Sequence, residues 1–194
     1  QVCDELTSQG AEAIYVVADV ANEADVRHIA EMAIQRFGAF DTWLNVAGVT
    51  IFGKNEEVTT QDMRRLFDIN FWGVVYGSLV AVQYLKSRGG ALINMGSETS
   101  DRAVPLQGIY SASKHAVKGF TDSLRVELEE EGVPLSVTLI KPSAIDTMLV
   151  KHAKNYLETE PRLPPPIYAP EMAANALLYA AEHPTRDLYV GGHA

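Results

Sequence analysis

Tyr110 and Lys114 are the residues whose types and spacing most directly indicate chemistry, because they lie four positions apart. On a helix this spacing places two side chains on one face, where both can take part in the transfer of the same proton. A phenol titrates near pKa ~10 and works poorly at neutral pH unless a neighbouring ammonium stabilises its anion. Ser97, which ends an apolar run upstream, could hold a substrate oxygen beside the phenol. The alternative is an amphipathic helix whose tyrosine packs and whose lysine is solvated.

Composition narrows the class of protein. The chain has 194 residues, of which 47% are hydrophobic and 21% charged, and this predicts one globular domain. The formal net charge of -9 argues against nucleic acid as a partner. We expect a cytoplasmic protein with no membrane segment, because no apolar run approaches ~18 residues and no signal-peptide pattern opens the chain.

The sequence predicts no metal site and no disulfide. Cys3 is the only cysteine, so neither an intrachain disulfide nor a cysteine-based metal cluster is possible. The histidines lack the paired spacing of a zinc site. They are His28, His115, His152, His183 and His193.

The elements that must position the candidate residues alternate between strand and helix. Continuous apolar runs without polar alternation predict buried strands at 13–20, 40–49, 91–95 and 135–140, and a short strand at 187–192. Helical patterns fill the intervals at 22–38, 59 to about 86, 110–132 and 171–183. This order predicts an α/β doubly wound parallel sheet in a single domain, with ligands at the carboxyl ends of the strands.

Residues 148–170 interrupt this alternation. Five prolines make a regular helix or sheet interior improbable there. We expect an insertion that forms a substrate loop or lid over the site, with a plain surface linker as the alternative.

Six motifs then fall in order at successive predicted strand ends and on the helices between them. They are Asp19-Val20, Asn45-Val46-Ala47-Gly48, Asn70, Ser97, Tyr110-x-x-x-Lys114 and Pro142-Ser143-x-x-x-Thr147. With these motifs the chain resembles the short-chain dehydrogenase/reductase family over nearly its whole length. The resemblance implies a Rossmann-like fold and an NAD(P)-dependent oxidoreductase acting on a carbonyl or secondary alcohol.

The resemblance also implies catalytic roles. Tyr110 would be the general acid or base, and Ser97 would hold the substrate oxygen. Lys114 would lower the pKa of Tyr110 and bind the ribose next to the nicotinamide. Asn70 would bind a water molecule that links Lys114 to solvent. The alternative for Asn70 is a capping or kinking residue, since asparagine competes with helical hydrogen bonds.

One half of the cofactor, NAD or NADP, is assigned to strand ends by the same resemblance. Asp19, with the Val20 backbone, would contact the adenine. Asn45, Ala47 and Gly48 would let the backbone approach the adenine ribose closely. The alternative for Asp19 is a residue that opens the following helix.

The nicotinamide half is assigned to residues 142–147. Pro142 and Ser143 would begin a wrap around the nicotinamide, the Ile145 backbone would contact its carboxamide, and the Thr147 hydroxyl would lie near the amide or a phosphate. A simple turn is the alternative for Ser143 and Thr147.

The chain departs from the family pattern in three places. Val46 stands where a second asparagine is usual, and Ser143 replaces a common glycine. The family's first strand and Gly-rich turn, which bind the pyrophosphate, are missing from these residues. We therefore expect 1–194 to be an incomplete dinucleotide-binding oxidoreductase domain, in which the choice between NAD and NADP is not encoded.

Two other functions compete with a dehydrogenase of small molecules. One is a catalytically silent family member that acts as a binding or scaffold protein, since a fold does not imply a function. The other is an epimerase or dehydratase, against which the compact region after Thr147 counts. The resemblance to the family also implies a homodimer or homotetramer formed by the helices at about 60–86 and 111–131. Four apolar residues of these helices could belong to the core or to an interface, namely Phe71, Trp72, Phe120 and Leu124.

Overall fold

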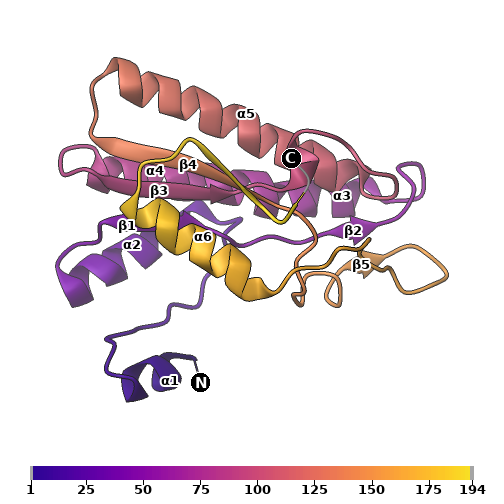
Figure 1. Ribbon diagram of the computed structural model, residues 1–194, viewed down its shortest axis with the longest axis horizontal. Coiled ribbons are helices and arrows are strands. Elements are labelled where there is room, and N and C mark those ends of the chain that lie inside the picture. Colours follow the sequence, from indigo (N-terminus) through magenta and orange to yellow (C-terminus); the bar gives the residue numbers. More distant parts are fainter. Residues whose placement is uncertain (1, 193–194) are drawn as a thin grey trace.

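A parallel sheet in the order β1-β3-β4-β6 forms the centre of the computed structural model (Figure 1). Its strands are β1 (Thr42–Asn45), β3 (Gly90–Met95), β4 (Leu135–Pro142) and β6 (Asp187–Val190). Every neighbouring pair is parallel, so the carboxyl ends of all four strands lie at the same end of the sheet, which we call its carboxyl edge. The structure describes residues 2–192, and the ends of the predicted domain, with His193, lie outside the described residues.

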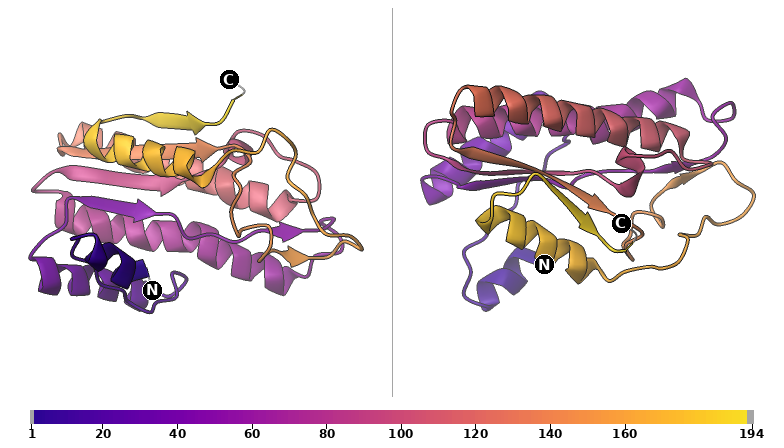
Figure 2. Two further views of the ribbon diagram at one scale, coloured as in Figure 1. Left: turned by 60° about the horizontal axis from the view of Figure 1, so that its bottom comes forward. Right: turned by 45° about the horizontal axis from the view of Figure 1, so that its top comes forward.

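Helices cover both faces of this sheet, which confirms the predicted doubly wound α/β fold (Figure 2). The helices α4 (Gly73–Leu85) and α5 (Gly108–Glu130) pack on one face, and α6 (Pro170–Glu182) packs on the other. Alternate residues of a strand point to opposite faces. Leu92 accordingly belongs to the cluster under α4 and α5, while Ile93 belongs to the cluster under α6.

The helix α2 (Glu23–Phe37) begins and ends where the sequence predicts. Its N-cap Asn22 accepts a hydrogen bond from the Ala24 amide at 3.0 Å, and Gly38 ends the helix with φ 81°. Val26 and Ala30 are buried against α4, so α2 extends the helical layer beyond the edge strand β1.

The long helix predicted from 59 to about 86 forms as three joined segments. These are α3 (Thr60–Phe67), the π-helical turn η1 (Asp68–Trp72) and α4. Thr59 caps the first segment by accepting a hydrogen bond from the Asp62 amide at 3.2 Å. π-helical turns inside α-helices are rare and often mark functional positions, and here the turn contains Asn70.

This long helix, Thr60–Leu85, is also the one described helix with the length and apolar composition of a membrane span. Half of its most apolar window is buried within the fold, against β1, β3 and α5. A core helix of an α/β sheet has the same properties, so its composition follows from burial.

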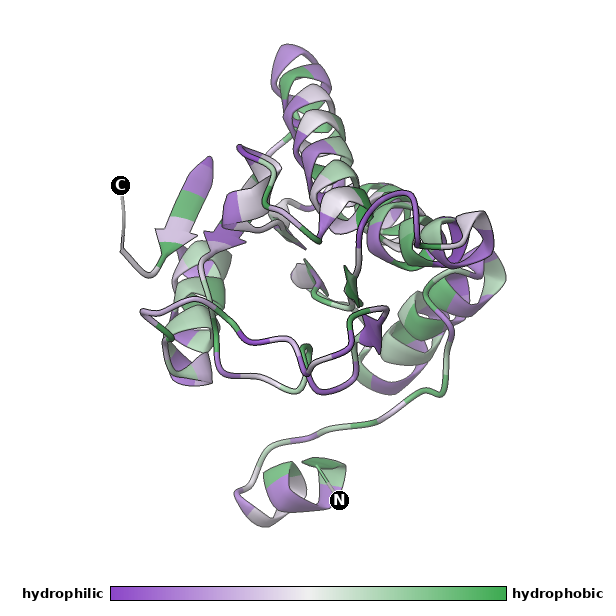
Figure 3. Ribbon diagram, turned by 90° about the vertical axis from the view of Figure 1, so that its right-hand side faces the viewer, coloured by the Kyte–Doolittle hydropathy of each residue, from purple (hydrophilic) through white to green (hydrophobic). Residues whose placement is uncertain are grey.

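The predicted strand at 13–20 is wrong. The segment has no strand structure, and Tyr15 and Val17 are 79% and 90% exposed. A strand needs a hydrogen-bonded neighbour, and among the described residues none pairs with this segment. It leads from α1 (Val2–Ser8) to α2 on the outside of the fold, and α1 lies apart from the sheet (Figure 3).

The Pro-rich region contains little regular structure, as predicted. Only the short strand β5 (Lys154–Asn155) forms within it, and this strand pairs in parallel with β2 (Ile51–Phe52). Residues 148–170 thus return from the end of β4 to the segment that follows β1.

Candidate active site

The four predicted catalytic residues come from three elements near the carboxyl edge of the sheet. Ser97 follows β3 and caps the short helix η2 (Glu98–Ser100), Tyr110 and Lys114 lie on α5, and Asn70 lies in η1. All four side chains are buried, with at most 8% of each residue exposed.

Local hydrogen bonds hold the Ser97 side chain in place. Its hydroxyl accepts from the Thr99 amide at 3.1 Å, and its own amide donates to the Ser100 hydroxyl at 3.1 Å. These contacts form a capping box that fixes the turn after β3. The Ser97 side chain is also hydrogen-bonded to the Tyr110 side chain, so one substrate oxygen could contact both hydroxyls.

The pKa of Tyr110 is raised, which differs from the predicted lowering by Lys114. Burial of the phenol is the main cause, because the anion is disfavoured away from water. The hydrogen bond with Ser97 opposes this effect, and the charge of Glu98 adds to it. The phenol therefore keeps its proton at neutral pH in this structure.

Lys114 lies beside the tyrosine as its spacing predicts. Its ammonium nitrogen is 5.7 Å from the centre of the Tyr110 ring and donates a hydrogen bond of 2.8 Å to the Met95 carbonyl. Burial lowers the pKa of Lys114 to about 8. Lys114 therefore remains mainly protonated near neutral pH, and the effect of burial on Tyr110 outweighs any lowering of its pKa by this ammonium.

Asn70 joins the loop after β1 to α5. Its amide oxygen accepts from the Val49 amide at 2.8 Å, and its amide nitrogen donates to the Val49 carbonyl at 2.9 Å and to the Ser113 hydroxyl at 3.2 Å. A β-carbon added at Gly48 would lie 3.4 Å from the Asn70 oxygen and 3.9 Å from the Lys114 nitrogen. Gly48 therefore leaves a small space directly above the lysine.

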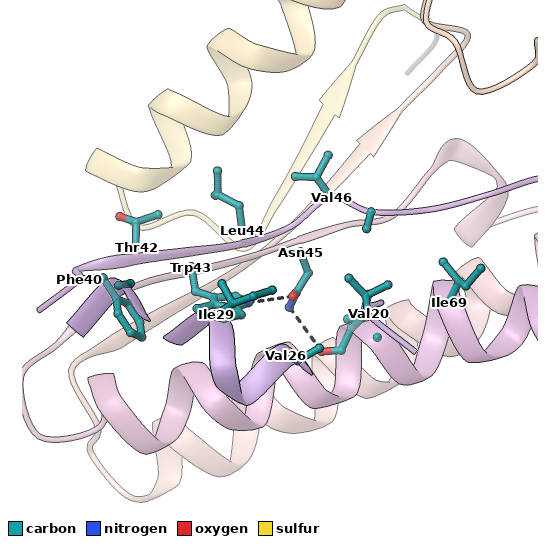
Figure 4. Close-up of a pocket in the computed structure, with 14 residues that line it drawn as sticks. Val20, Val26, Ile29, Phe40, Thr42, Trp43, Leu44, Asn45, Val46 and Ile69 are labelled. Atoms are coloured by element: carbon teal, nitrogen blue, oxygen red, sulfur yellow. Dashed lines mark hydrogen bonds between the residues drawn. The ribbon is translucent and has the colours of Figure 1, made fainter. Parts of the chain in front are cut away.

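Three residues predicted for the adenine half of the cofactor line one groove beside the edge strand β1 (Figure 4). They are Val20, Asn45 and Ala47, and the groove holds about 320 Å³ between this strand, α2 and the start of α4. Its wall is mostly apolar, with Val26, Phe40 and Trp43 among its members. The predicted strand ends thus share one concave surface.

The side-chain amide of Asn45, although it lines this groove, is hydrogen-bonded to neighbouring residues of the fold. It accepts from the Trp43 indole at 2.8 Å and donates to Asn94 at 2.8 Å and to Ser78 at 3.2 Å. A side chain at Gly77 would collide with this Asn45 amide. Asn45 therefore fixes α4 against the sheet.

Asn94 was missed by sequence reasoning. It is fully buried, and besides its bond with Asn45 it donates to the Thr121 hydroxyl on α5 at 2.9 Å. The sequence does contain a signal for it, namely an asparagine inside the apolar run 91–95. A buried amide needs hydrogen-bond partners, so an asparagine in a buried strand indicates a polar network. The hydrogen bonds of Asn45 and Asn94 thus join β1 and β3 to α4 and α5.

Asp19 is exposed and forms one contact within its own segment and one with α3. Its carboxylate pairs with Arg65 of α3 at 2.7 Å and accepts from the Ala21 amide at 3.0 Å. These contacts, the Ala21 hydrogen bond first, lower the pKa of Asp19. The N-cap of α2 is Asn22, so Asp19 precedes this helix and does not open it, which differs from the alternative prediction.

The predicted nicotinamide wrap begins where β4 ends. Pro142 pairs with Val190 in the sheet, and the Ser143 hydroxyl donates to Glu98 at 3.2 Å. Ile145 forms an isolated bridge with Tyr168, and the Thr147 hydroxyl accepts from the Leu149 amide at 3.3 Å. Ser143 is thereby brought to the Ser97 turn, whereas Thr147 is exposed and makes a turn.

Lys141 is a buried charge that sequence reasoning also missed. Its side chain is 3% exposed and contacts the Tyr189 hydroxyl at 2.6 Å and the Asp101 carboxylate at 3.1 Å. Lys118 of α5 pairs with the same carboxylate. Asp101 therefore ties the loop after Ser97 to β4, β6 and α5.

Comparison of the sequence with models of known protein families gives a match over most of the chain. The sequence model of the short chain dehydrogenase family matches residues 1–157. The chain belongs to the short-chain dehydrogenase family. This result confirms the resemblance drawn from the six motifs.

Curated members of the short-chain dehydrogenase family are similar to most of this chain. An uncharacterized oxidoreductase of Bacillus subtilis, YxnA, is 51% identical over 197 residues, which cover 100% of this chain and 55% of YxnA. The 11-beta-hydroxysteroid dehydrogenase A of Sesamum indicum is 33% identical over 153 residues, covering 78% of this chain and 43% of that protein. The chain thus spans about half the length of the curated relatives it matches.

Solved structures show the same fold at low sequence identity. An alcohol dehydrogenase from the archaeon Thermococcus sibiricus, complexed with 5-hydroxy-NADP, superimposes with a TM-score of 0.82 at 22% identity. The match covers 97% of this chain and 79% of that one. A short-chain dehydrogenase from Streptomyces avermitilis also gives 0.82, at 24% identity, with 97% and 74% covered.

Proposed function

We propose that this chain is the catalytic part of an NAD(P)-dependent oxidoreductase that interconverts a carbonyl and a secondary alcohol on a small molecule. The observation that carries the proposal is the buried group of Ser97, Tyr110, Lys114 and Asn70 at the carboxyl edge of the sheet. Their side chains supply an oxygen-binding pair, a proton donor and a cation, which together suit carbonyl reduction.

Tyr110 donates the proton in this proposal. A substrate carbonyl oxygen held by Ser97 and Tyr110 receives the phenolic proton as a hydride reaches the carbonyl carbon. The raised pKa of Tyr110 supports this direction, since a neutral phenol has a proton to give. In alcohol oxidation the tyrosinate takes the proton back.

Lys114 and Asn70 support the proton transfer. The Lys114 ammonium stabilises the tyrosinate left after donation, from its position 5.7 Å from the ring centre. Asn70 holds the loop at Val49 and the helix at Ser113, and so fixes the space between them. To restore the phenol, Lys114 would pass a proton to the tyrosinate and regain one from a water molecule beside Asn70 that is linked to solvent.

A nicotinamide cofactor, NAD or NADP, would supply or accept the hydride when bound. The residues fit this group in part. The space at Gly48 above the Lys114 nitrogen suits a ribose hydroxyl, and Ser143 lies at the same edge as Ser97. The relative from Thermococcus sibiricus, solved with 5-hydroxy-NADP, supports a dinucleotide of this kind. Residues 148–170 would form the lid on the substrate side.

The proposal is tested by following nicotinamide absorbance with the full-length protein and a panel of ketones and secondary alcohols. We expect oxidation or reduction of the cofactor, and we expect Tyr110→Phe to reduce kcat by about 10²-fold or more, because general acid catalysis is lost. The affinity for the cofactor, measured by nicotinamide fluorescence, should stay nearly unchanged in this variant.

The scaffold alternative predicts the opposite outcome. Absence of both cofactor turnover and nicotinamide binding in the wild-type protein would support a silent binding protein. A wild-type rate in Tyr110→Phe would refute the assignment of Tyr110. Tyr15→Phe is the matched control, because Tyr15 is 79% exposed and outside the site.

A further inference from the structure

Glu98 is a carboxylate placed directly beside the proposed reaction centre. It follows Ser97 in the chain and is the first residue of η2, whose capping box fixes the turn. The residue is half-buried, and its Oε2 atom accepts a hydrogen bond from the Ser143 hydroxyl at 3.2 Å. The carboxylate therefore lies between the Ser97 turn and the segment after β4.

The charge of Glu98 is not neutralised by a neighbouring cation. Among residues 2–192 its carboxylate forms no ion pair, and the nearby lysines are engaged elsewhere. Lys114 donates to the Met95 carbonyl, and Lys118 and Lys141 pair with Asp101. An unpaired charge in a partly buried site acts over a longer range than one in water.

The Glu98 carboxylate also acts on the reaction centre through space. Its negative charge is one of the causes that raise the pKa of Tyr110. A charge that reaches the phenol also reaches a substrate whose oxygen is held by Ser97 and Tyr110. A hydroxyl on the neighbouring substrate carbon would find an acceptor in Glu98, whereas a carboxylate or phosphate there would be repelled.

We infer that Glu98 selects neutral substrates with a second hydroxyl beside the reacting carbon, namely hydroxyketones or vicinal diols, and rejects anionic ones. The inference rests on the proposed function and specifies the substrate class of the same site. A hydroxyl that donates to a carboxylate gains a charge-assisted hydrogen bond, about twice as strong as a neutral one. Glu98 is in this sense a specificity-determining residue.

The test uses three ketones that share an ethyl ketone and differ in one group. These are 3-pentanone, 1-hydroxy-2-butanone and 2-oxobutanoate, which carry an ethyl, a hydroxymethyl and a carboxylate group on the other side of the carbonyl. In the full-length wild-type protein we expect kcat/KM to be highest for the hydroxyketone and lowest for the oxoacid. In Glu98→Gln the hydroxyketone should lose about tenfold relative to 3-pentanone, and the oxoacid should gain about tenfold.

A conservative variant and a matched control separate this role from a structural one. Glu98→Asp keeps the charge and should keep the rejection of 2-oxobutanoate. Glu130→Gln removes one charge from an exposed position on α5 and should leave the ratios of the three ketones unchanged. Thermal unfolding of each variant reports whether the turn has been damaged.

The two proposals fail in different ways. Equal substrate ratios in the wild type and Glu98→Gln, with turnover present, would overturn the role of Glu98 and leave the oxidoreductase standing. Absence of turnover with all three ketones and of nicotinamide binding would overturn the proposed function, and the inference with it.

Discussion

Burial changes the pKa values of Tyr110 and Lys114. Both side chains are nearly inaccessible to solvent, so each is pushed toward its neutral form. The pKa of the phenol rises and the pKa of the ammonium falls to about 8. The pair is therefore set to hold one proton on the tyrosine near neutral pH, as a proton donor requires.

Lys114 should make stability depend on pH. Its folded pKa of about 8 lies below its ordinary value of 10.5, so the unfolded chain binds more protons between these values. The cost of burying the charge is present in full below pH 8 and is relieved as the pH rises toward 10.5. The wild type should therefore gain up to roughly 3 kcal/mol of unfolding free energy, relative to Lys114→Met, across this window.

Urea unfolding at a series of pH values measures this difference. Lys151→Met, which removes an exposed lysine, should follow the wild type. A constant difference between the wild type and Lys114→Met from pH 7 to 10.5 would show that burial does not shift the pKa of Lys114.

At the scale of elements, the Pro-rich region contacts the rest of the fold through Tyr168, which bridges Ile145, and through β5. Its strand β5 pairs with β2, and Lys154 pairs with Asp62 of α3 at 2.7 Å, while the Tyr156 hydroxyl donates to the same carboxylate. Gly53 permits the approach, because a β-carbon there would lie 2.8 Å from that of Tyr156. Asp62 thus anchors the proposed lid.

Asp62→Asn should loosen this region without unfolding the sheet. Hydrogen bonds from Lys154 and Tyr156 lower the pKa of Asp62 to about 2, so the anchor is present in full above pH 3.8 and is lost as the pH falls through about 2. Hydrogen exchange at residues 154–156 should be faster in the variant at pH 7, by about tenfold, while β3 and β4 keep their protection.

Glu158→Gln changes an exposed charge in the same region and should exchange like the wild type. Unchanged protection at residues 154–156 in Asp62→Asn would mean that the β2–β5 pairing alone holds the segment.

At the scale of the whole molecule, α4, η1 and α5 expose several large apolar side chains, alongside polar ones such as Ser123 and Glu127. Leu124 is buried in the core, but Trp72, Leu79 and Val126 are 44%, 53% and 48% exposed. Phe71 is partly buried, and its ring packs edge-on against that of Phe120. An exposed apolar surface on two long helices favours self-association.

We predict that the full-length protein is a dimer or tetramer through this surface. The double variant Leu79→Glu/Val126→Glu should weaken association at least about tenfold, because buried charges replace apolar contacts. Light scattering coupled to size exclusion measures the mass. Met172→Glu, on α6 at the opposite face of the sheet, is the control, and an unchanged mass in the double variant would exclude the α4–α5 surface.

The sequence by itself determined most of the order of strands and helices along the chain and indicated a candidate catalytic group. Continuous apolar runs identified β3 and β4, because a strand buried on both faces has apolar residues throughout and does not alternate between apolar and polar ones. Tyr110, Lys114 and Ser97 could be named from type and spacing, since i and i+4 share a helical face and Ser97 ends a strand. The family comparison agrees with the resemblance to short-chain dehydrogenases.

Tertiary structure decided what depends on partners distant in the chain. The run at 13–20 has the composition of a strand but no described neighbour to pair with. The amide of Asn45 is committed to Asn94 and Ser78, and the carboxylate of Asp19 to Arg65. The raised pKa of Tyr110 and the charge of Glu98 beside it likewise follow from burial and from contacts across the fold, which no local pattern encodes.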